Sequence, residues 1–192
     1  FIIFISSSSL FVPVPNVFIC IAIGGGVGAS VLTSQYLGSR EYRLMKTSVN
    51  TALTSFFVIS VILAVFGAVA SPAIMAWLRT PENIFAEAVL YLRIYFIGLP
   101  FLFMYNVLAS VFNALGKSKI PLYFLIFSSI LNVIMDLFMV IVMNLGVAGV
   151  ALATIIAQGI SAVISFLVLV RYLKGQPEQG LLFDGGMLVR MA

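Results

Sequence analysis

Histidine is absent from this chain of 192 residues, and cysteine occurs once, at Cys20. The chain therefore has no imidazole for acid–base catalysis or a zinc site, and it can form neither an internal disulfide nor a thiolate metal cluster. Charged residues are scarce too, at 8% of the chain, against about 25% in soluble domains. No basic run is long enough to make a nucleic-acid patch, so we expect no nucleic-acid partner.

Apolar residues dominate what remains, because hydrophobic types make up 62% of the sequence. The charged residues gather in short links between long apolar runs, a pattern typical of a polytopic α-helical protein surrounded by membrane lipids. We therefore predict an all-α bundle of about five transmembrane spans, over approximately 11–37, 47–78, 85–115, 121–143 and 147–172.

The basic residues give this bundle an orientation. Seven of them fall in alternate links and after the last span, whereas the other two links hold only Arg79; the seven are Arg40, Arg43, Lys46, Lys117, Lys119, Arg171 and Lys174. By the positive-inside rule the links with the seven are cytoplasmic, which places the N-terminus outside and the C-terminus in the cytoplasm. A chain that begins outside without a signal peptide suggests that one earlier span precedes it.

Two stretches carry small or polar residues inside the apolar runs. The first span follows VPVPN, whose prolines disfavour a regular helix, so we expect the helix to begin after them. Its centre is rich in glycine, which permits another helix to approach closely. The start of the second span has Thr47, Asn50, Thr51 and Thr54 on approximately one face, where we expect polar contacts to another helix.

The last two spans form a hairpin with an aspartate inside the membrane. Asp136 lies four residues after Asn132, and Thr154 lies four residues before Gln158, so each pair shares a helix face. Counted from the turn at about 1.5 Å per residue, Asp136 and Thr154 come to one depth and Asn132 and Gln158 to another. Carboxylate, amide and hydroxyl oxygens suit a proton or a hard cation such as sodium.

This constellation has two readings. In the first reading it is an ion site, because an ionised carboxylate at mid-membrane costs about 2.5–3.5 kcal/mol and is retained mostly for function. Alternatively, it is a hydrogen-bonded cluster that holds two helices together. Under the first reading Asp136, Asn132 and Thr154 bind the cation. The other polar residues that we expect to line a cavity are Gln158, Asn106 and Ser161.

Several ordered runs resemble the bacterial multidrug and toxic compound extrusion (MATE) family. They are GGGVGASVLTSQYLGS, YLRIYFIGLPFLFMYNVLASVFNALGKSKIPLYF, LNVIMDLFM and LGVAGVALATIIAQGISA, and the similarity covers approximately residues 23–174. The resemblance implies spans two to six of the N-terminal lobe of a twelve-span, two-lobe transporter in the bacterial inner membrane. Residues 1–175 would then be a partial lobe, and 176–192 a cytoplasmic tail or the start of the linker between lobes.

The same resemblance implies a cation site at Asn132, Asp136 and Thr154, with H⁺ or Na⁺ as coupling ion and no other cofactor. The family site also uses an acidic residue on span one, which this chain lacks along with the second lobe. The implied activity is export of drugs or toxic organic compounds by alternating access. The alternatives are a lipid-linked saccharide flippase of the same superfamily, and a structural or channel subunit without coupled transport. We expect no enzyme, since no nucleophile–base pair is visible.

Overall fold

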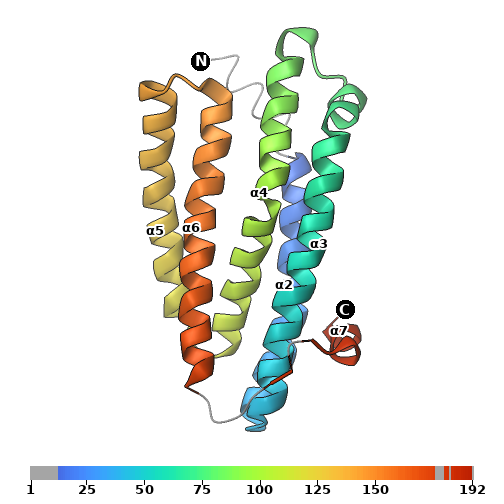
Figure 1. Cartoon of the computed structure of the whole chain (residues 1–192), viewed down its shortest axis with the longest axis vertical. Coiled ribbons are helices and arrows are strands. Elements are labelled where there is room, and N and C mark those ends of the chain that lie inside the picture. Colours follow the sequence, from blue (N-terminus) through green and yellow to red (C-terminus); the bar gives the residue numbers. More distant parts are fainter. Residues whose placement is uncertain (1–12, 176–179, 182, 192) are drawn as a thin grey trace.

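The protein is a bundle of long antiparallel helices in this computed structural model, which describes residues 13–175, 180–181 and 183–191 (Figure 1). The helices are α2 (Pro13–Gly38), α3 (Tyr42–Trp77), α4 (Glu82–Ala114), α5 (Lys119–Leu137), α6 (Gly146–Lys174) and the short α7 (Gly185–Met191). A π-helical turn, η1 (Phe138–Val142), extends α5. The described residues include no β-strand, which confirms the predicted all-α fold.

Several of the helices that the structure describes have the length and composition of membrane spans. Four of them are long and apolar enough to cross a bilayer, namely α3, α4, α5 with η1, and α6. They correspond to the last four predicted spans. The first predicted span corresponds to α2, whose 26 residues extend over about 39 Å at 1.5 Å per residue. That length exceeds the approximately 30 Å of a hydrocarbon core.

The beginning of α2 corrects one sequence prediction. The helix begins at Pro13 and includes Pro15, whereas we expected it to begin after both prolines. Both residues lie in the first turn, where the backbone N–H groups have no intrahelical acceptor. Because proline's missing N–H costs nothing there, the helix can accept prolines that would break it further along.

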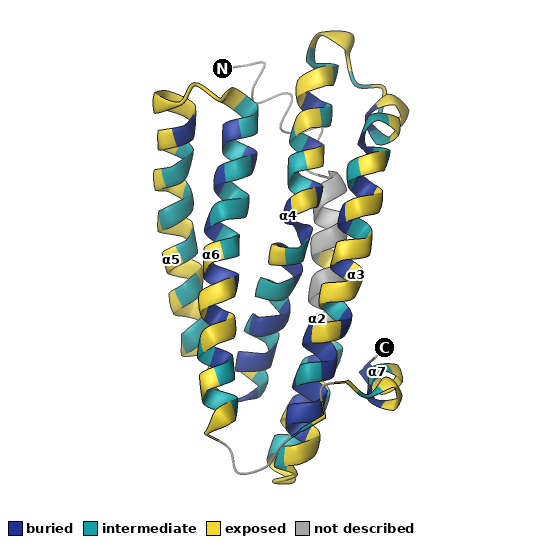
Figure 2. Cartoon of the chain, viewed as in Figure 1, coloured by how far each residue is buried: buried dark blue, intermediate teal, exposed yellow. Residues whose placement is uncertain are grey.

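Helix α4 is the centre of the bundle, and it packs against α2, α3 and α6. Two groups of buried apolar side chains surround it, one toward each end of the bundle. Helix α5 lies at the periphery and has no buried residue of its own, as the exposed and half-buried colours along it show (Figure 2). Its main contact is with α6, so the hairpin of these two helices is joined to the bundle through α6.

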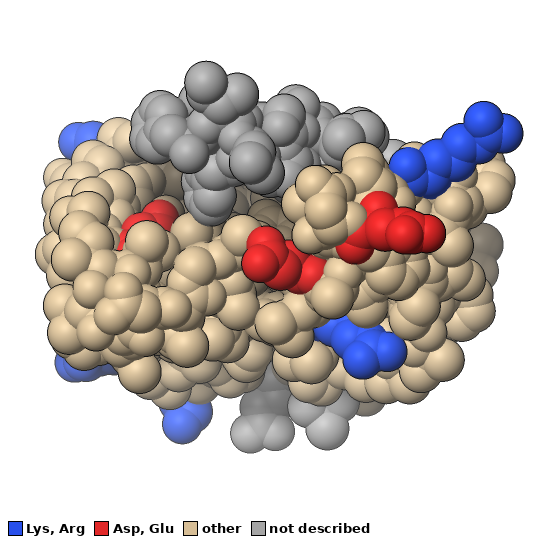
Figure 3. Space-filling view, turned by 90° about the horizontal axis from the view of Figure 1, so that it is seen from above, with Lys and Arg blue, Asp and Glu red and all other residues tan. Residues whose placement is uncertain are grey.

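Most of the charged side chains lie near the ends of the bundle, with Asp136 inside the hairpin as an exception. We call one end the basic end, because α2, α4 and α6 finish there and basic residues lie at or just after their last residues, namely Arg40, Lys117 and Lys174. The opposite end holds the α3–α4 and η1–α6 connections, and its surface is mostly uncharged with a few acidic and basic side chains (Figure 3). Which end faces the cytoplasm stays a prediction from the positive-inside rule.

Candidate functional site

The site is built on the α5–η1–α6 hairpin. The chain reverses over a short turn in which Asn144 and Gly146 have φ values of 53° and 55°. Asparagine and glycine are the residues that adopt this left-handed conformation most readily, so the local sequence favours a sharp reversal here. The turn brings α5 and α6 side by side, and Gly149 of α6 lies against Met139 of η1.

A direct hydrogen bond joins the two helices within the membrane-spanning region. Asn132 Nδ2 donates to Thr154 Oγ1 at 3.2 Å, and Thr154 Oγ1 donates to the carbonyl of Val150 at 3.0 Å. Our depth count instead placed Asp136 level with Thr154. The count assumed a uniform α-helical rise, but a π turn takes more residues per turn, so residues of α5 lie nearer to the connection than counted. Asn132 therefore reaches Thr154.

Asp136 lies one helical turn from this hydrogen bond, toward the connection. The residue is half-buried, and its Oδ1 atom is buried without a hydrogen-bond partner among the described residues. Tyr91 of α4 is close enough to interact electrostatically with the carboxylate. A buried, unsatisfied carboxylate oxygen is costly, so it marks a position where a proton or a cation would be stabilised.

A small cavity of about 180 Å³ opens between α4, α5 and α6 beside the Asn132–Thr154 bond. Gln158 lines this cavity together with Asn132 and Thr154. The other two residues of our cavity prediction lie elsewhere. Asn106 is half-buried and donates to the carbonyl of Leu102 at 2.8 Å. Ser161 is fully buried, and its hydroxyl has no partner within the described part of the chain.

Four further residues lie near the site without having been predicted from the sequence. Ser128, Ser129 and Tyr105 line the cavity, and Tyr91 approaches Asp136 from α4. Ser128 carried a usable signal, because it precedes Asn132 by four residues and so continues the polar face of α5. The two tyrosines carried no such signal, since the neighbouring sequence does not distinguish an aromatic residue that faces a site from one that faces lipid.

The hairpin presents one carboxylate beside neutral oxygens. Among the residues that the structure describes, no three acidic, cysteine or histidine side chains come together. Asp136 therefore lies near neutral amide and hydroxyl groups, those of Asn132 and Thr154.

Helices this long and apolar, among the residues that the structure describes, define an α-helical integral membrane protein. The MatE family matches residues 3–138, and the chain belongs to this family. One relative is the probable multidrug resistance protein YoeA of Bacillus subtilis, 34% identical over 174 residues, which cover 88% of this chain and 37% of YoeA. Another is the multidrug export protein MepA of Staphylococcus aureus, 27% identical over 85% of this chain and 36% of MepA.

Solved structures agree with this fold. The chain superposes on inward-facing and outward-facing conformations of a multidrug resistance MATE family transporter, with TM-scores of 0.84 and 0.85 and sequence identities of 18% in both cases. The inward-facing match covers 96% of this chain and 43% of the other. The outward-facing match covers 97% and 42%. The chain thus spans less than half of the length of these relatives and neighbours.

Proposed function

We propose that this chain forms part of one lobe of a cation-coupled exporter of drugs or toxic organic compounds in the bacterial inner membrane. A preceding span and a second lobe would complete the transporter. Asp136 would bind a proton or sodium ion, with Asn132 and Thr154 supplying neutral oxygens. The observation that carries this proposal is the buried Oδ1 of Asp136, which has no hydrogen-bond partner among the described residues.

The mechanism requires that the cation bind one conformation of the transporter more tightly than another. A lone carboxylate suits this role, because the cost of its burial is relieved only while a proton or cation is bound. The near-equal similarity to inward-facing and outward-facing neighbours supports a lobe that keeps its fold while the access side changes. The names of the bacterial relatives support multidrug export as the activity.

The test is Asp136→Asn in a full-length transporter that contains this lobe. The asparagine preserves the shape of the side chain, so insertion and folding should be close to normal. Ion-driven drug efflux should fall by about 5- to 150-fold, because a coupling free energy of about 1–3 kcal/mol spans that range. Efflux is measured in proteoliposomes under an imposed proton or sodium gradient.

Glu87→Gln is the matched control, because it also removes one carboxylate charge but from an exposed position near the start of α4. This variant should transport normally. If Asp136→Asn also transports normally at equal expression, the carboxylate has a structural role and the proposed coupling site is wrong. Running the assay with each gradient separately identifies the coupling ion.

A further inference from the structure

The C-terminal segment does not extend away from the bundle but returns along it. Residues 180–181 and 183–191, which we call the strap, lie along the basic ends of α2 and α3 and finish in α7 (Figure 1). Helix α7 contacts α2 and α3. The strap thus bridges two helices that are consecutive in the chain and far from it in sequence.

Three side chains of α3 hydrogen-bond the backbone of the strap. Thr47 Oγ1 accepts from the Leu181 N–H at 3.0 Å, and Asn50 Nδ2 donates to the Leu181 carbonyl at 3.0 Å. Thr51 Oγ1 accepts from the Asp184 N–H, also at 3.0 Å. Thr47 and Thr51 are 2% and 0% exposed. The polar face that we expected to contact another helix therefore binds non-helical backbone, whose polar groups need such partners.

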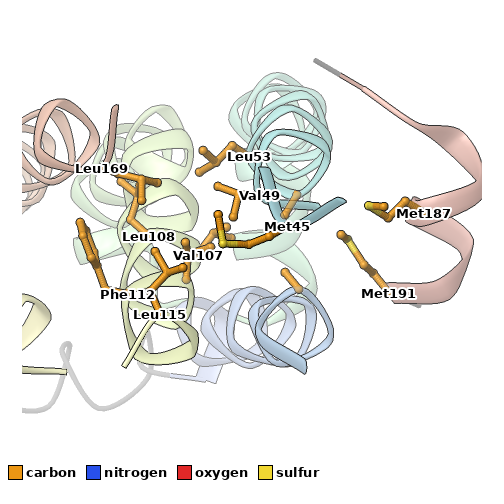
Figure 4. Close-up of a cluster of buried hydrophobic side chains, with 13 residues drawn as sticks. Met45, Val49, Leu53, Val107, Leu108, Phe112, Leu115, Leu169, Met187 and Met191 are labelled. Atoms are coloured by element: carbon orange, nitrogen blue, oxygen red, sulfur yellow. The ribbon is translucent and has the colours of Figure 1, made fainter. Parts of the chain in front are cut away.

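The end of the strap is held by a cap and by apolar packing. Asp184 Oδ1 accepts from the N–H groups of Gly186 at 2.9 Å and Met187 at 3.3 Å, which fixes the start of α7. Met187 and Met191 then point from α7 toward Met45 and join its group of buried side chains (Figure 4). The strap is thus attached at two places, by hydrogen bonds to α3 and by apolar contacts near α2.

Helix α2 accommodates the strap through one glycine. The carbonyl of Met191 lies directly against Gly28, and a methyl group at position 28 would overlap it. Gly24, one turn earlier on the same helix, has nothing within 4 Å of where its methyl group would be. Of these two glycines, only Gly28 contacts the strap, and only at Gly28 would a side chain clash with a neighbour.

The strap lies along the first turns of α3. Thr51 lies nine residues after Tyr42, or about 14 Å from the start of the helix. The strap is held by a few hydrogen bonds and side-chain contacts and is not itself part of a span, so its docking can open without unfolding the spans.

We propose that the strap, residues 180–181 and 183–191, clamps the basic ends of α2 and α3 together, and that undocking of this strap frees those ends to move. The basis is the set of contacts to both helices at once: the α3 side chains Thr47, Asn50 and Thr51, and the α2 glycine Gly28. This role does not depend on the ion site, which lies on the α5–α6 hairpin.

Hydrogen–deuterium exchange of the purified chain in lipid nanodiscs tests the clamp. Gly28→Ala should speed exchange of the Leu181 and Asp184 amides by about tenfold or more, since undocking removes their acceptors. It should also speed exchange in the last turns of α2 and the first turns of α3. Gly24→Ala, the matched control, should change neither region, because its methyl group meets open space.

A second variant approaches the strap from α3. Thr47→Val with Thr51→Val keeps the side-chain shapes and removes both hydroxyl acceptors, so it should have the same effect on both regions. Thr54→Val, on an exposed part of the same face, should have none. Faster exchange confined to the strap would overturn the clamp, and unchanged strap exchange in both variants would overturn the docking itself.

Discussion

Replacing Thr154 by valine removes the hydroxyl that joins α5 to α6 and leaves the shape of the side chain almost unchanged. Two hydrogen bonds are lost: the one donated to the Val150 carbonyl and the one accepted from Asn132. The first loss is small, because a carbonyl inside a helix keeps its backbone hydrogen bond. The effect on stability therefore depends on what happens to the amide of Asn132.

The cavity beside Asn132 decides that cost. A buried donor left without a partner costs about 1–3 kcal/mol. The cavity measures about 180 Å³, whereas one water takes about 30 Å³ in the liquid. Serine, asparagine and glutamine side chains line it, so a water can enter and accept from the freed amide. We therefore expect Thr154→Val to reduce the free energy of unfolding by only about 0.5–1 kcal/mol, close to the mean of about 0.6 kcal/mol for hydrogen bonds between membrane helices.

A double-mutant cycle measures this interaction directly. The variants are Thr154→Val, Asn132→Ala and the double variant, unfolded at equilibrium in mixed micelles. The coupling energy should lie between about 0.3 and 1.7 kcal/mol, the upper limit seen for such bonds in membranes. A coupling of zero would refute the Asn132–Thr154 contact. A cost of 3 kcal/mol or more for Thr154→Val alone would refute the argument from cavity hydration.

Two further predictions concern packing and topology. Gly67→Ala should reduce the free energy of unfolding by about 1–3 kcal/mol relative to Gly159→Ala. A methyl group at position 67 overlaps the buried Phe96 ring, whereas one at position 159 meets the Phe101 ring at an ordinary contact distance of 3.5 Å. Equal stabilities of the two variants would contradict the α3–α4 packing. Single cysteines at Ser118 and Asn83, in a Cys20→Ser background, should react with an impermeant maleimide from opposite sides of the membrane, since Ser118 lies in the α4–α5 link and Asn83 in the first turn of α4, at opposite ends of the bundle. Labelling of both from one side would contradict the span count.

The sequence was sufficient for the fold because the bilayer restricts the possible structures so strongly. Long apolar runs must be helices, since no other open structure satisfies its backbone hydrogen bonds in lipid. Links of a few residues then force antiparallel neighbours. The start of the first span is a local feature that the sequence does not predict. Proline breaks a helix interior but is tolerated in the first turn, so the effect of Pro13 and Pro15 depends on where the helix begins.

The candidate site was only partly predictable. The spacing of four between Asn132 and Asp136 indicated one polar face, and the hairpin brought Thr154 to it. The register between the helices was not predictable, because the π turn of η1 changes the rise and has no signal in the apolar letters FMVIV. Tyr91 was equally hidden, since its approach to Asp136 depends on how α4 packs against the hairpin.

Two polar faces of similar composition show where sequence reasoning ends. Thr47, Asn50 and Thr51 on α3 and Asn132 with Thr154 on the hairpin are all threonines and asparagines at helical spacing within apolar runs. The first set binds the backbone of the strap, 130 or more residues away in sequence. The second set binds its partner helix one turn from Asp136, whose buried Oδ1 has no hydrogen-bond partner in the described part of the chain. Hydroxyl and amide groups can hydrogen-bond any nearby polar group, so they do not distinguish a candidate ion site from a docking surface. The carboxylate does, because its burial costs several kcal/mol without a counter-charge or a proton.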